Sequence, residues 1–446
     1  MRWLYSLLMV LLKPFVRRKL ARRAGAEPNY ATAVEERFGD YTQIAAQKKG
    51  AWVWIHAVSL GEARAAEPLI KRLRERIPGL QLLLTHGTAT GRSEGERYLQ
   101  DDDIQVWLPW DTPGAVARFL RHFRPQVGIL IETEVWPNLV HACRGAGVPL
   151  VLANARLSEQ SLQRARQLAW LARPAYQALA AVWAQTDADA SRLSVLGAPV
   201  KGVFGNLKFD ASLRTELLER GRQWRVESAD LGEPPVILFA SSREGEELLW
   251  LQACSQTPAA AAVRWLIVPR HPHRFDEVCG LLTDRGLPVS RRSTWSEGGP
   301  PCSLNAGTVC LGDSLGEMAL YYGLADVALL GGSFAPLGGQ NLIEAAACGC
   351  PVVMGPHTFN FSEAAALAIE AGAALRVATM VEAIEAAVAL AQDRHRQALF
   401  AECARNFSNA HRGAVDRTAS AVISLLSEQG VDLFQVVHSE RATGLT

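Results

Sequence analysis

The chain has 446 residues, of which 49% are hydrophobic. This length and composition can bury a large core, favour two or three domains, and exclude a chain that is disordered over most of its length. Its 46 basic and 45 acidic residues leave a formal net charge of +1. Because such a chain lacks the broad positive field typical of nucleic-acid binding, no nucleic-acid partner is expected, and an anionic ligand must be met locally.

An apolar, basic segment opens the chain. Residues 3–12 are mostly apolar, Lys13 and Pro14 interrupt the run, and positions 1–23 hold seven basic and no acidic residues. The run is about half of the roughly 20 residues that a spanning helix requires. Because most of the charge follows the apolar run, a cleaved signal peptide fits poorly. The pattern favours a helix over residues 1–24 that lies on the cytoplasmic face of a membrane, and a helix packed on its own protein is the alternative.

Short apolar runs that alternate with longer helical patterns follow this segment. Between the first two runs, Leu69, Ile70, Leu73 and Ile77 recur at helical spacing among charged residues, as in an amphipathic crossover helix. Such alternation predicts a parallel sheet with helices on both faces. The candidate strands are residues 51–56, 82–85, 105–108, 127–131, 149–152, 181–184 and 200–203.

The pattern starts again after a polar stretch near residues 212–234. Candidate strands of this second series are residues 236–239, 265–268, 308–311, 327–330 and 351–354. Two such series predict an α/β chain with two Rossmann-like, doubly wound domains that face a central cleft at the carboxyl ends of their strands. We assign residues 25–215 and 216–430 to these domains and residues 431–446 to a tail.

The sharpest local signal runs from Leu329 to Glu344. A strand enters the paired glycines Gly331 and Gly332, and a helix begins near Asn341. Such a turn would bring bare backbone N–H groups and a helix N-terminus to one point, which suits a phosphate, and Glu344 could accept from a ribose. A tight turn with a first-turn carboxylate is the alternative. Because the stretch has neither a P-loop nor a GxGxxG spacing, the cofactors of those motifs are not expected.

Polar residues follow two more strands of the second half. Pro269 and Arg270 come directly after the strand 265–268, where the guanidinium could pair with a phosphate through two parallel hydrogen bonds. Residues 315–317 open a further helix and could supply backbone contacts. An arginine at a strand end is often only solvated, but its coincidence with the glycine turn favours a binding site.

Three charged residues of the first half lie near strand ends. Glu62 follows Gly61 at the start of the amphipathic helix, and it could take a proton from an acceptor hydroxyl if burial raised the pKa that the helix N-terminus lowers. Glu132 ends the apolar strand 127–131, and Lys208 precedes the domain boundary. A helix-start acid without another role is the alternative for Glu62, although strand-end positions favour function for Glu132 and Lys208.

Metal sites find little support in the sequence. A Cys-Gly-Cys at 348–350 and a His-Pro-His at 271–273 could each offer two ligands, but neither has a second pair nearby. The acidic runs 101–103 and 187–189 could imitate a metal-binding DxD, and we interpret them as solvated charge. We therefore expect no metal and no cofactor.

Five motifs, in this order along the chain, resemble those of the 3-deoxy-D-manno-octulosonic acid (Kdo) transferases, which decorate the lipid A precursor of Gram-negative bacteria. The resemblance extends from the N-terminus to about residue 415. Five ordered motifs are far more specific than any one of them. They are HAVSLGE at 56–62, ETEVWP at 132–137, GNLK at 205–208, VPRH at 268–271, and GGSF through GGQNLIE at 331–344.

The resemblance implies a GT-B fold, in which the second domain holds the nucleotide and the first receives the acceptor. It implies an inverting, metal-independent transfer of Kdo from CMP-Kdo to the tetra-acylated disaccharide bisphosphate precursor of lipid A, at the cytoplasmic face of the bacterial inner membrane. By motif position, Glu62 is the proton acceptor, and Glu132 and Lys208 assist the transition state. The implied CMP contacts are Pro269, Arg270, Leu315, Gly316, Glu317, Asn341, Leu342, Ile343 and Glu344.

Three other functions stay open at this point. A GT-B enzyme with a lipid-linked acceptor and a UDP-sugar donor has the same fold logic. A sugar-nucleotide epimerase on this fold would need no lipid and no membrane segment. A non-catalytic membrane scaffold is disfavoured because so many polar motifs converge on strand ends.

Overall fold

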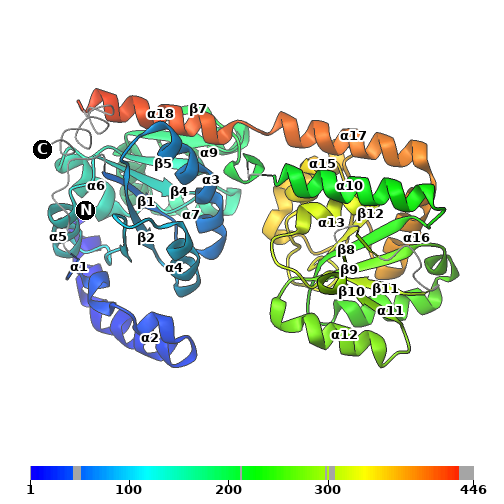
Figure 1. The fold of residues 1–446 in the computed structure, drawn as a ribbon. Helices are drawn as coiled ribbons and strands as arrows, with labels where there is room; N and C mark the ends of the chain where they lie inside the picture. The colour runs from blue at the N-terminus through cyan, green and yellow to red at the C-terminus, as the bar shows by residue number, and fades with distance from the viewer. Residues whose placement is uncertain (1, 44–51, 211–212, 297–298, 301–306, 431–446) are drawn as a thin grey trace, which may run out of the picture. The chain divides into compact units, whose positions relative to one another are not determined.

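The computed structural model describes residues 2–43, 52–210, 213–296, 299–300 and 307–430, which form two compact units (Figure 1). The first unit comprises Met1–Ala211 and Arg412–Thr446, and the second comprises Ser212–His411. The predicted cleft between the domains stays a prediction.

The first unit is built on a sheet of seven parallel strands in the order β3-β2-β1-β4-β5-β6-β7. All seven strands predicted for this half are present. Because the chain winds outward from β1 in one direction and from β4 in the other, the switch point lies between these two strands, where ligands bind in such sheets. The strands are β1 (Trp52–His56), β2 (Gln81–His86), β3 (Ile104–Trp107), β4 (Val127–Ile131), β5 (Leu150–Ala155), β6 (Ala181–Ala184) and β7 (Val200–Val203).

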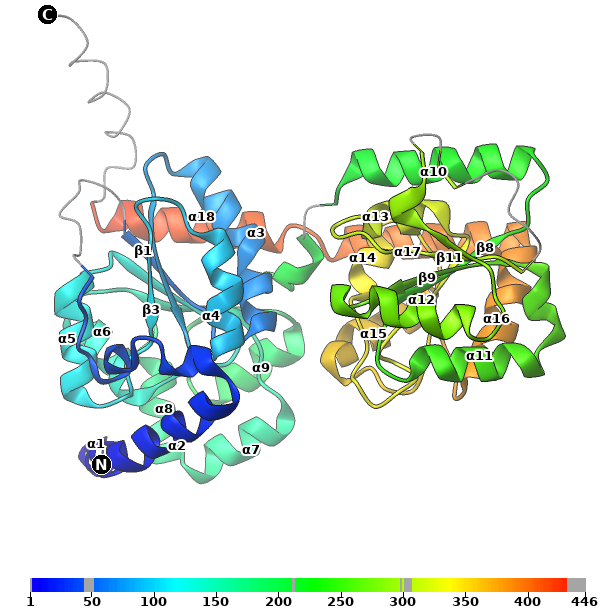
Figure 2. The same ribbon diagram turned by 60° about the horizontal axis from the view of Figure 1, so that its bottom comes forward.

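Helices cover both faces of this sheet (Figure 2). On one face, α3 (Leu60–Arg76) and α18 (Ala414–Glu428) pack side by side, and the expected apolar stripe of α3 is buried. On the other face, α5 (Pro113–Phe123) and α6 (Pro137–Gly145) bury Phe119 and Val140 against the sheet. The other helices of the unit are α1 (Arg2–Leu11), α2 (Lys13–Ala26), α4 (Ala89–Gly95), α7 (Glu159–Gln167), α8 (Ala169–Gln177) and α9 (Asp187–Val195).

The second unit also has seven parallel strands, in the order β10-β11-β9-β8-β12-β13-β14, with the switch point between β8 and β12. The five predicted strands are present. The prediction missed β10 and β14, because each has three residues and only partial burial. The strands are β8 (Val236–Ser242), β9 (Arg264–Pro269), β10 (Val289–Arg291), β11 (Val309–Leu311), β12 (Val327–Leu330), β13 (Val352–Met354) and β14 (Ala374–Arg376).

Glycines allow two helices of the second unit to pack closely. A Cβ at Gly221 of α10 would overlap the carbonyl oxygen of Leu320 of α13, and a Cβ at Gly323 would overlap that of Leu218. Larger residues would push these helices apart. The helices are α10 (Thr215–Asp230), α11 (Glu246–Gln256), α12 (Phe275–Thr283), α13 (Met318–Leu324), α14 (Leu342–Ala347), α15 (Ser362–Glu370), α16 (Met380–Gln392) and α17 (Arg394–Ala410).

The division of the chain differs from the predicted ranges at its C-terminal end. We assigned residues 216–430 to the second domain, but α18 belongs to the first unit. Val415, Ala419 and Val422 bury their side chains in the core of that unit, and Asp210 accepts from the N–H groups of Gly413 and Val415, both at 2.7 Å. The apolar stripe of a helix does not reveal which of two sheets it covers.

Two acidic residues that we interpreted as solvated have side chains that are only 3% exposed. Asp103 pairs with Arg74 and accepts from the N–H group of Leu82 at 2.8 Å. Asp189 accepts from the N–H group of Leu157 at 2.9 Å and also pairs with Arg192. Both carboxylates therefore tie loops to helices.

The N-terminal helix α1 contacts its unit through polar atoms and leaves its apolar face exposed. Tyr5 donates to Asp111 at 2.8 Å, Ser6 donates to Asn138 at 2.9 Å, and Met9 is buried. A soluble amphipathic helix would instead bury its apolar face and expose its polar face. The exposed side chains are Trp3, Leu4, Leu7, Leu8, Val10, Leu11 and, in α2, Phe15.

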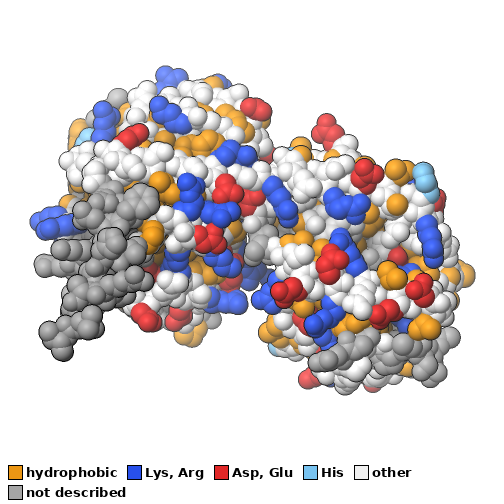
Figure 3. Space-filling view, turned by 45° about the horizontal axis from the view of Figure 1, so that its top comes forward, with side chains coloured by type: hydrophobic (Ala, Val, Ile, Leu, Met, Phe, Trp, Pro, Cys, Tyr) orange, Lys and Arg blue, Asp and Glu red, His pale blue; other side chains and the backbone are white. Residues whose placement is uncertain are grey.

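A helix that crosses a membrane needs about 20 mostly apolar residues. Within the described ranges, no helix is both long and apolar enough to cross a bilayer. Basic and acidic side chains are interspersed on the face drawn in Figure 3. Arg72 and Asp416 form an exposed ion pair at 2.7 Å.

Candidate active site

The first cluster of candidate residues lies at the carboxyl ends of β1 and β4. After β1, Ser59 caps α3 by accepting from the N–H group of Glu62 at 3.4 Å. The Glu62 carboxylate reaches back and accepts from the N–H group of Val58 at 2.5 Å. This reciprocal pair resembles a capping box, with the N–H group of Val58 as the donor in place of that of the N-cap residue Ser59. It fixes where α3 begins and holds the carboxylate at the sheet edge.

The pKa of Glu62 is raised to about 7, chiefly because burial disfavours the charged form. The hydrogen bond from Val58 opposes this shift, and the nearby carboxylates of Glu132 and Glu134 add to it. A carboxyl group with a pKa near 7 can exchange a proton efficiently at neutral pH. The sequence predicted this competition between burial and the helix N-terminus, and burial dominates.

Glu132 occupies a strained backbone position directly after β4. Its φ is +67°, in the left-handed region that non-glycine residues seldom adopt. Two hydrogen bonds with the end of β5 hold it there: its N–H donates to the carbonyl of Ala153 at 3.0 Å, and its carbonyl accepts from the N–H group of Arg156 at 3.1 Å. Strain that the surrounding structure maintains in this way is common at functional sites.

Lys208 forms an ion pair with Glu132, with 3.0 Å between Nζ and Oε1. The two side chains are 24% and 13% exposed, so solvent screens the pair only partly. The segment of Lys208 is held by Asn154, which accepts from the N–H group of Leu207 at 3.0 Å, and by Asn206, which accepts from the N–H group of Lys208 at 3.0 Å. Asn154 was not predicted, because only its positive φ and its burial mark it.

The structure thus brings together the three charged residues predicted for the first half. Glu62, Glu132 and Glu134 interact electrostatically, and Lys208 is bonded to one of them. Burial also raises the pKa of Glu134, against a hydrogen bond from Trp136. The arrangement can accept a proton at Glu62 and offset negative charge at Lys208.

The second cluster lies at the carboxyl ends of β8, β9 and β12, where the glycine turn corrects one expectation. We predicted bare N–H groups that could bind a phosphate, but the buried carboxylate of Glu246 takes several of them. It accepts from Gly332 at 2.6 Å, Phe334 at 3.0 Å and Ala335 at 3.3 Å, and also from Arg243 at 2.9 Å. An internal carboxylate, rather than an external anion, therefore shapes this turn.

Arg270 lies beside the second part of the same turn. Its Nε donates to Oε1 of Gln340 at 3.2 Å, and its guanidinium opposes the upward pKa shift that burial imposes on Glu344. Asn341 caps α14 by accepting from the N–H group of Ile343 at 3.2 Å. Leu342, the first residue of α14, is buried, and Pro269 ends β9. These predicted residues therefore gather near one sheet edge.

Residues 315–317 precede α13 as predicted. Gly316 has a φ of +78°, and Leu315 is exposed. Glu317 is partly satisfied within the unit, because it pairs with Arg292 at 3.0 Å. No described contact joins Leu315 or Gly316 to Arg270 or the glycine turn.

A buried ion pair, which was not predicted, stabilises this cluster. Glu247 accepts two hydrogen bonds from Arg274, at 2.9 and 3.0 Å, and a third from Ser242 at 2.6 Å. This pair connects the ends of β8 and β9, which carry Arg243 and Arg270. Gly-Glu-Glu directly after a strand was the available signal, but spacing does not identify the partners of either acid.

A protein metal site needs several ligand side chains close together. In the part of the chain that the structure describes, no three His, Cys, Asp or Glu side chains are grouped as a metal ion would require.

Both units are parallel, doubly wound sheets with polar clusters at the carboxyl ends of their strands, which is the GT-B architecture. A solved glycosyltransferase from Rickettsia africae has the same fold, with a TM-score of 0.51 and 13% identity, over 86% of this chain and 100% of that one.

Sequence comparison defines the family. The family model of the 3-deoxy-D-manno-octulosonic-acid transferases (kdotransferases) matches residues 32–211. The 3-deoxy-D-manno-octulosonic acid transferase of Bordetella pertussis is 46% identical over 94% of this chain and 98% of that protein. The Haemophilus influenzae enzyme of that name is 32% identical over 93% and 96%. The chain belongs to the Kdo transferase family.

Proposed function

We propose that this protein transfers Kdo from CMP-Kdo to a hydroxyl group of the tetra-acylated disaccharide bisphosphate precursor of lipid A, with inversion and without a metal ion. Family membership supports the transferred sugar, and the acidic cluster after β1 and β4 supports the chemistry. The observation that carries the proposal is the partly buried Glu62, whose pKa of about 7 suits a general base.

The proposed step is a single displacement. The acceptor oxygen forms a bond to the anomeric carbon of Kdo while the bond from that carbon to the phosphate oxygen of CMP breaks, and CMP leaves with the electron pair. The hydroxyl proton passes to the carboxylate of Glu62. Lys208, held by Glu132, offsets negative charge during the transfer, and preorganised charges of this kind are usually a large catalytic contribution.

The second unit is the proposed donor site. Arg270 and the turn residues Asn341 to Glu344 would hold CMP, with Pro269 and residues 315–317 as further contacts. A guanidinium beside a folded glycine turn suits a phosphate, because it can donate two parallel hydrogen bonds.

An assay with CMP-Kdo and the tetra-acylated precursor, with products counted by mass, tests this proposal. We expect a mass increase of one or more Kdo units and release of CMP. Competition by CMP but not by UDP would support the donor, whereas preference for UDP would favour another GT-B transferase. Conversion of a free UDP-sugar without any lipid acceptor would favour an epimerase.

Glu246 is expected to determine CMP affinity through the shape of the glycine turn. Glu246→Gln replaces one of two accepting oxygens by a donor, so N–H groups lose their partner and the turn rearranges. We expect the Kd for CMP to rise roughly tenfold or more. Isothermal titration measures this. The exposed neighbour Glu244, as Glu244→Gln, is the control with the same change of charge, and equal affinities in the two variants would contradict this role.

The N-terminal helices are the proposed contact with the membrane, at its cytoplasmic face. Trp3, Leu11 and Phe15 are 65%, 61% and 70% exposed, although each is a large apolar side chain. No acidic residue occurs in α1 or α2, and α2 carries several cations. Apolar side chains next to cations suit the interface of an anionic bilayer.

Replacing two of the exposed leucines should weaken membrane binding. Leu7→Ser with Leu8→Ser removes apolar area that would otherwise enter the bilayer, and we expect partitioning to fall roughly tenfold or more. Co-sedimentation with vesicles containing phosphatidylglycerol measures it. Leu248→Ser with Leu249→Ser, exposed leucines of α11, is the matched control. Unchanged partitioning in the first variant would exclude α1 as the contact.

A further inference from the structure

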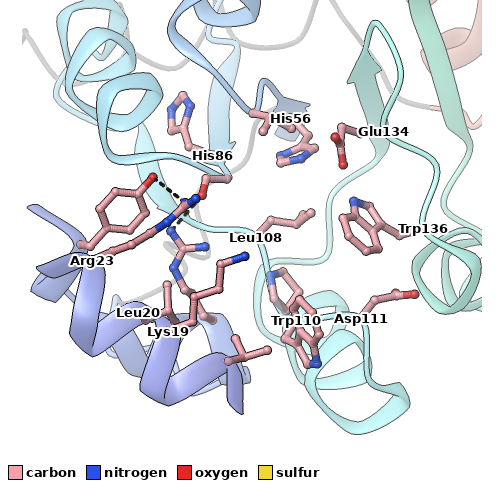
Figure 4. A pocket seen from close by; sticks show the side chains of 16 residues that line it. Lys19, Leu20, Arg23, His56, His86, Leu108, Trp110, Asp111, Glu134 and Trp136 are labelled. Atoms are coloured by element: carbon pink, nitrogen blue, oxygen red, sulfur yellow. Dashed lines mark hydrogen bonds between the residues drawn. The ribbon is translucent and has the colours of Figure 1, made fainter. Parts of the chain in front are cut away.

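A cavity of about 280 Å³ in the first unit lies between α2 and the carboxyl ends of β1 to β4 (Figure 4). Lys19 and Arg23 line it from α2, and His56, Glu134 and Trp136 line it from the opposite side. None of the residues predicted to bind CMP or to take part in the transfer lines this cavity, although His56, Val58, Glu134 and Trp136 of the family motifs do.

His56 lines the cavity and has a buried ring nitrogen without a hydrogen-bond partner among the described residues. Its Nδ1 lies 3.1 Å from the carbonyl oxygen of Thr85 and 2.9 Å from the hydroxyl oxygen of the same residue. Because the carbonyl only accepts, we assign the proton to Nδ1. Burial, together with His86, lowers the pKa of His56 to about 3, so the ring is neutral. Its buried Nε2 is therefore a lone pair, and it has no partner among the described residues. Because this atom is buried, a ligand hydroxyl would reach it through a small side-chain shift at the cavity wall.

His86, which also lines the cavity, differs from His56 in this respect. Its Nδ1 lies 2.8 Å from the carbonyl oxygen of Ala57, and its Nε2 lies 3.0 Å from Nε2 of Gln105. Both of its nitrogens are thus satisfied within the protein. The unused atom of His56 is a property of this position rather than of histidines in this sheet.

Three cations line the α2 side of the cavity. Lys19, Arg23 and Arg37 form no ion pair with any carboxylate that the structure describes. Arg37 donates to the carbonyl of Gly87 at 3.1 Å and lies over the ring of Trp107 at 3.7 Å, while its Nε is buried without a partner. Such a group of cations suits an anionic ligand.

The acidic residues of the cavity do not neutralise this group. Asp111 is engaged elsewhere, since it accepts from Tyr5 and from the N–H groups of Asn138 and Leu139. Glu134 lies on the far side, near His56 (Figure 4). The cavity therefore has one cationic wall and one wall of hydrogen-bonding groups, with apolar side chains between them.

The cavity also adjoins the proposed general base. Val58 lines it, and the N–H group of Val58 is the hydrogen-bond donor to Glu62. Glu134, which interacts electrostatically with Glu62, lines it as well. A ligand held in the cavity would thus lie next to the group that accepts the proton.

We infer that this cavity binds a phosphorylated sugar, with its phosphate against Lys19, Arg23 and Arg37 and a hydroxyl group donating to Nε2 of His56. The inference rests on the proposed function, because the acceptor would supply this chemistry as one phosphate-bearing end of its disaccharide. The cavity would then be the acceptor subsite, and the phosphate would determine which acceptors bind there.

Two neighbouring arginines test the phosphate. Both arginines are exposed, but only Arg23 lines the cavity. Arg23→Gln and Arg22→Gln remove the same charge, so both should lower attraction to an anionic membrane equally. Relative to Arg22→Gln, Arg23→Gln should raise the KM for the bisphosphate acceptor roughly tenfold. The KM for CMP-Kdo should not change.

The dephosphorylated acceptor completes this comparison. With it, the two variants should have the same KM, because the contact that Arg23 loses is absent. Equal KM values with the phosphorylated acceptor, or an equal loss with both acceptors, would overturn the inference.

Two variants with side chains of different length test the role of His56. His56→Asn can keep the hydrogen bond to Thr85 but removes the acceptor Nε2, and the KM for the acceptor should rise about fivefold. His56→Gln places an oxygen near the position of Nε2 and should restore most of this loss. Equal KM values for His56→Asn and the unchanged protein would remove His56 from the subsite.

A binding measurement separates this inference from the proposed function. Glucosamine 1-phosphate, titrated into the full chain, should change the fluorescence of Trp110 and Trp136 and saturate, and glucosamine should bind at least tenfold more weakly. Saturable binding without any Kdo transfer would contradict the proposed function alone. Kdo transfer with no difference between the two sugars would contradict the subsite alone.

Discussion

Glu62→Gln should lower the rate of Kdo transfer by roughly 10²–10⁴-fold, the usual contribution of a general base. Glutamine can still accept from the N–H group of Val58, so α3 keeps its start, but it cannot take up a proton. CMP binding should not change, because the proposed donor site lies in the other unit. Single-turnover assays and CMP titration measure the two effects. Glu75→Gln, an exposed acid of the same helix, is the control.

The pH dependence of the unchanged enzyme should follow from the same carboxyl group. Because the base acts as a carboxylate, kcat should rise with pH, with a midpoint near the pKa of about 7. The folded chain favours protonated Glu62, so its contribution to stability falls as pH rises from about 4.5 to about 7.

Stability measurements provide an independent check on Glu62. At pH 8, Glu62→Gln should raise the free energy of unfolding by about 1–3 kcal/mol, because it removes a partly buried charge. A variant that is fully active would refute the base, and a variant that is inactive but less stable would indicate a damaged fold.

Lys208→Gln should have the second large effect, lowering kcat by roughly 10–10³-fold. The change removes the cation that offsets charge in the transfer and leaves the carboxylate of Glu132 unpaired. The net charge around Glu62 becomes more negative, so the midpoint of the pH profile should move above about 7.

Two further lysine variants separate the loss of charge at Lys208 from other effects of the substitution. Lys208→Arg keeps the charge and should retain the pH midpoint of the unchanged enzyme, even if altered geometry lowers kcat. Lys201→Gln removes an exposed charge from β7 and should change neither value. If Lys208→Gln lowered kcat without moving the pH midpoint, its electrostatic coupling to Glu62 would be disproved.

The glycine turn shows which features a local sequence pattern can predict and which it cannot. Residues 329–344 predicted the end of a strand, a turn and a helix beginning near Asn341, and all three are present. The partner of the turn was wrong, because the N–H groups that we expected to be bare are bonded to Glu246, 86 residues away from Gly332. Backbone conformation depends on neighbours along the chain, whereas the partner of an N–H group depends on which element folds beside it.

The acidic cluster gives a similar lesson for the candidate site. Motif position predicted Glu62, Glu132 and Lys208, but their ion pair joins residues 76 apart in the chain, and Asn154 in β5 holds the segment of Lys208. His56 and Arg37 could not be predicted as cavity residues either. Each becomes informative only once burial and missing partners are known.

The sequence by itself determined twelve of the fourteen strands that the structure describes, the two α/β series and the motifs of the family, because apolar periodicity and turn residues act over short stretches of chain. Only the tertiary structure decided that α18 returns to the first unit, that Glu246 occupies the glycine turn, and that three cations and an unused histidine nitrogen share one cavity. These features arise from contacts between distant elements, and residue spacing does not record which surfaces meet.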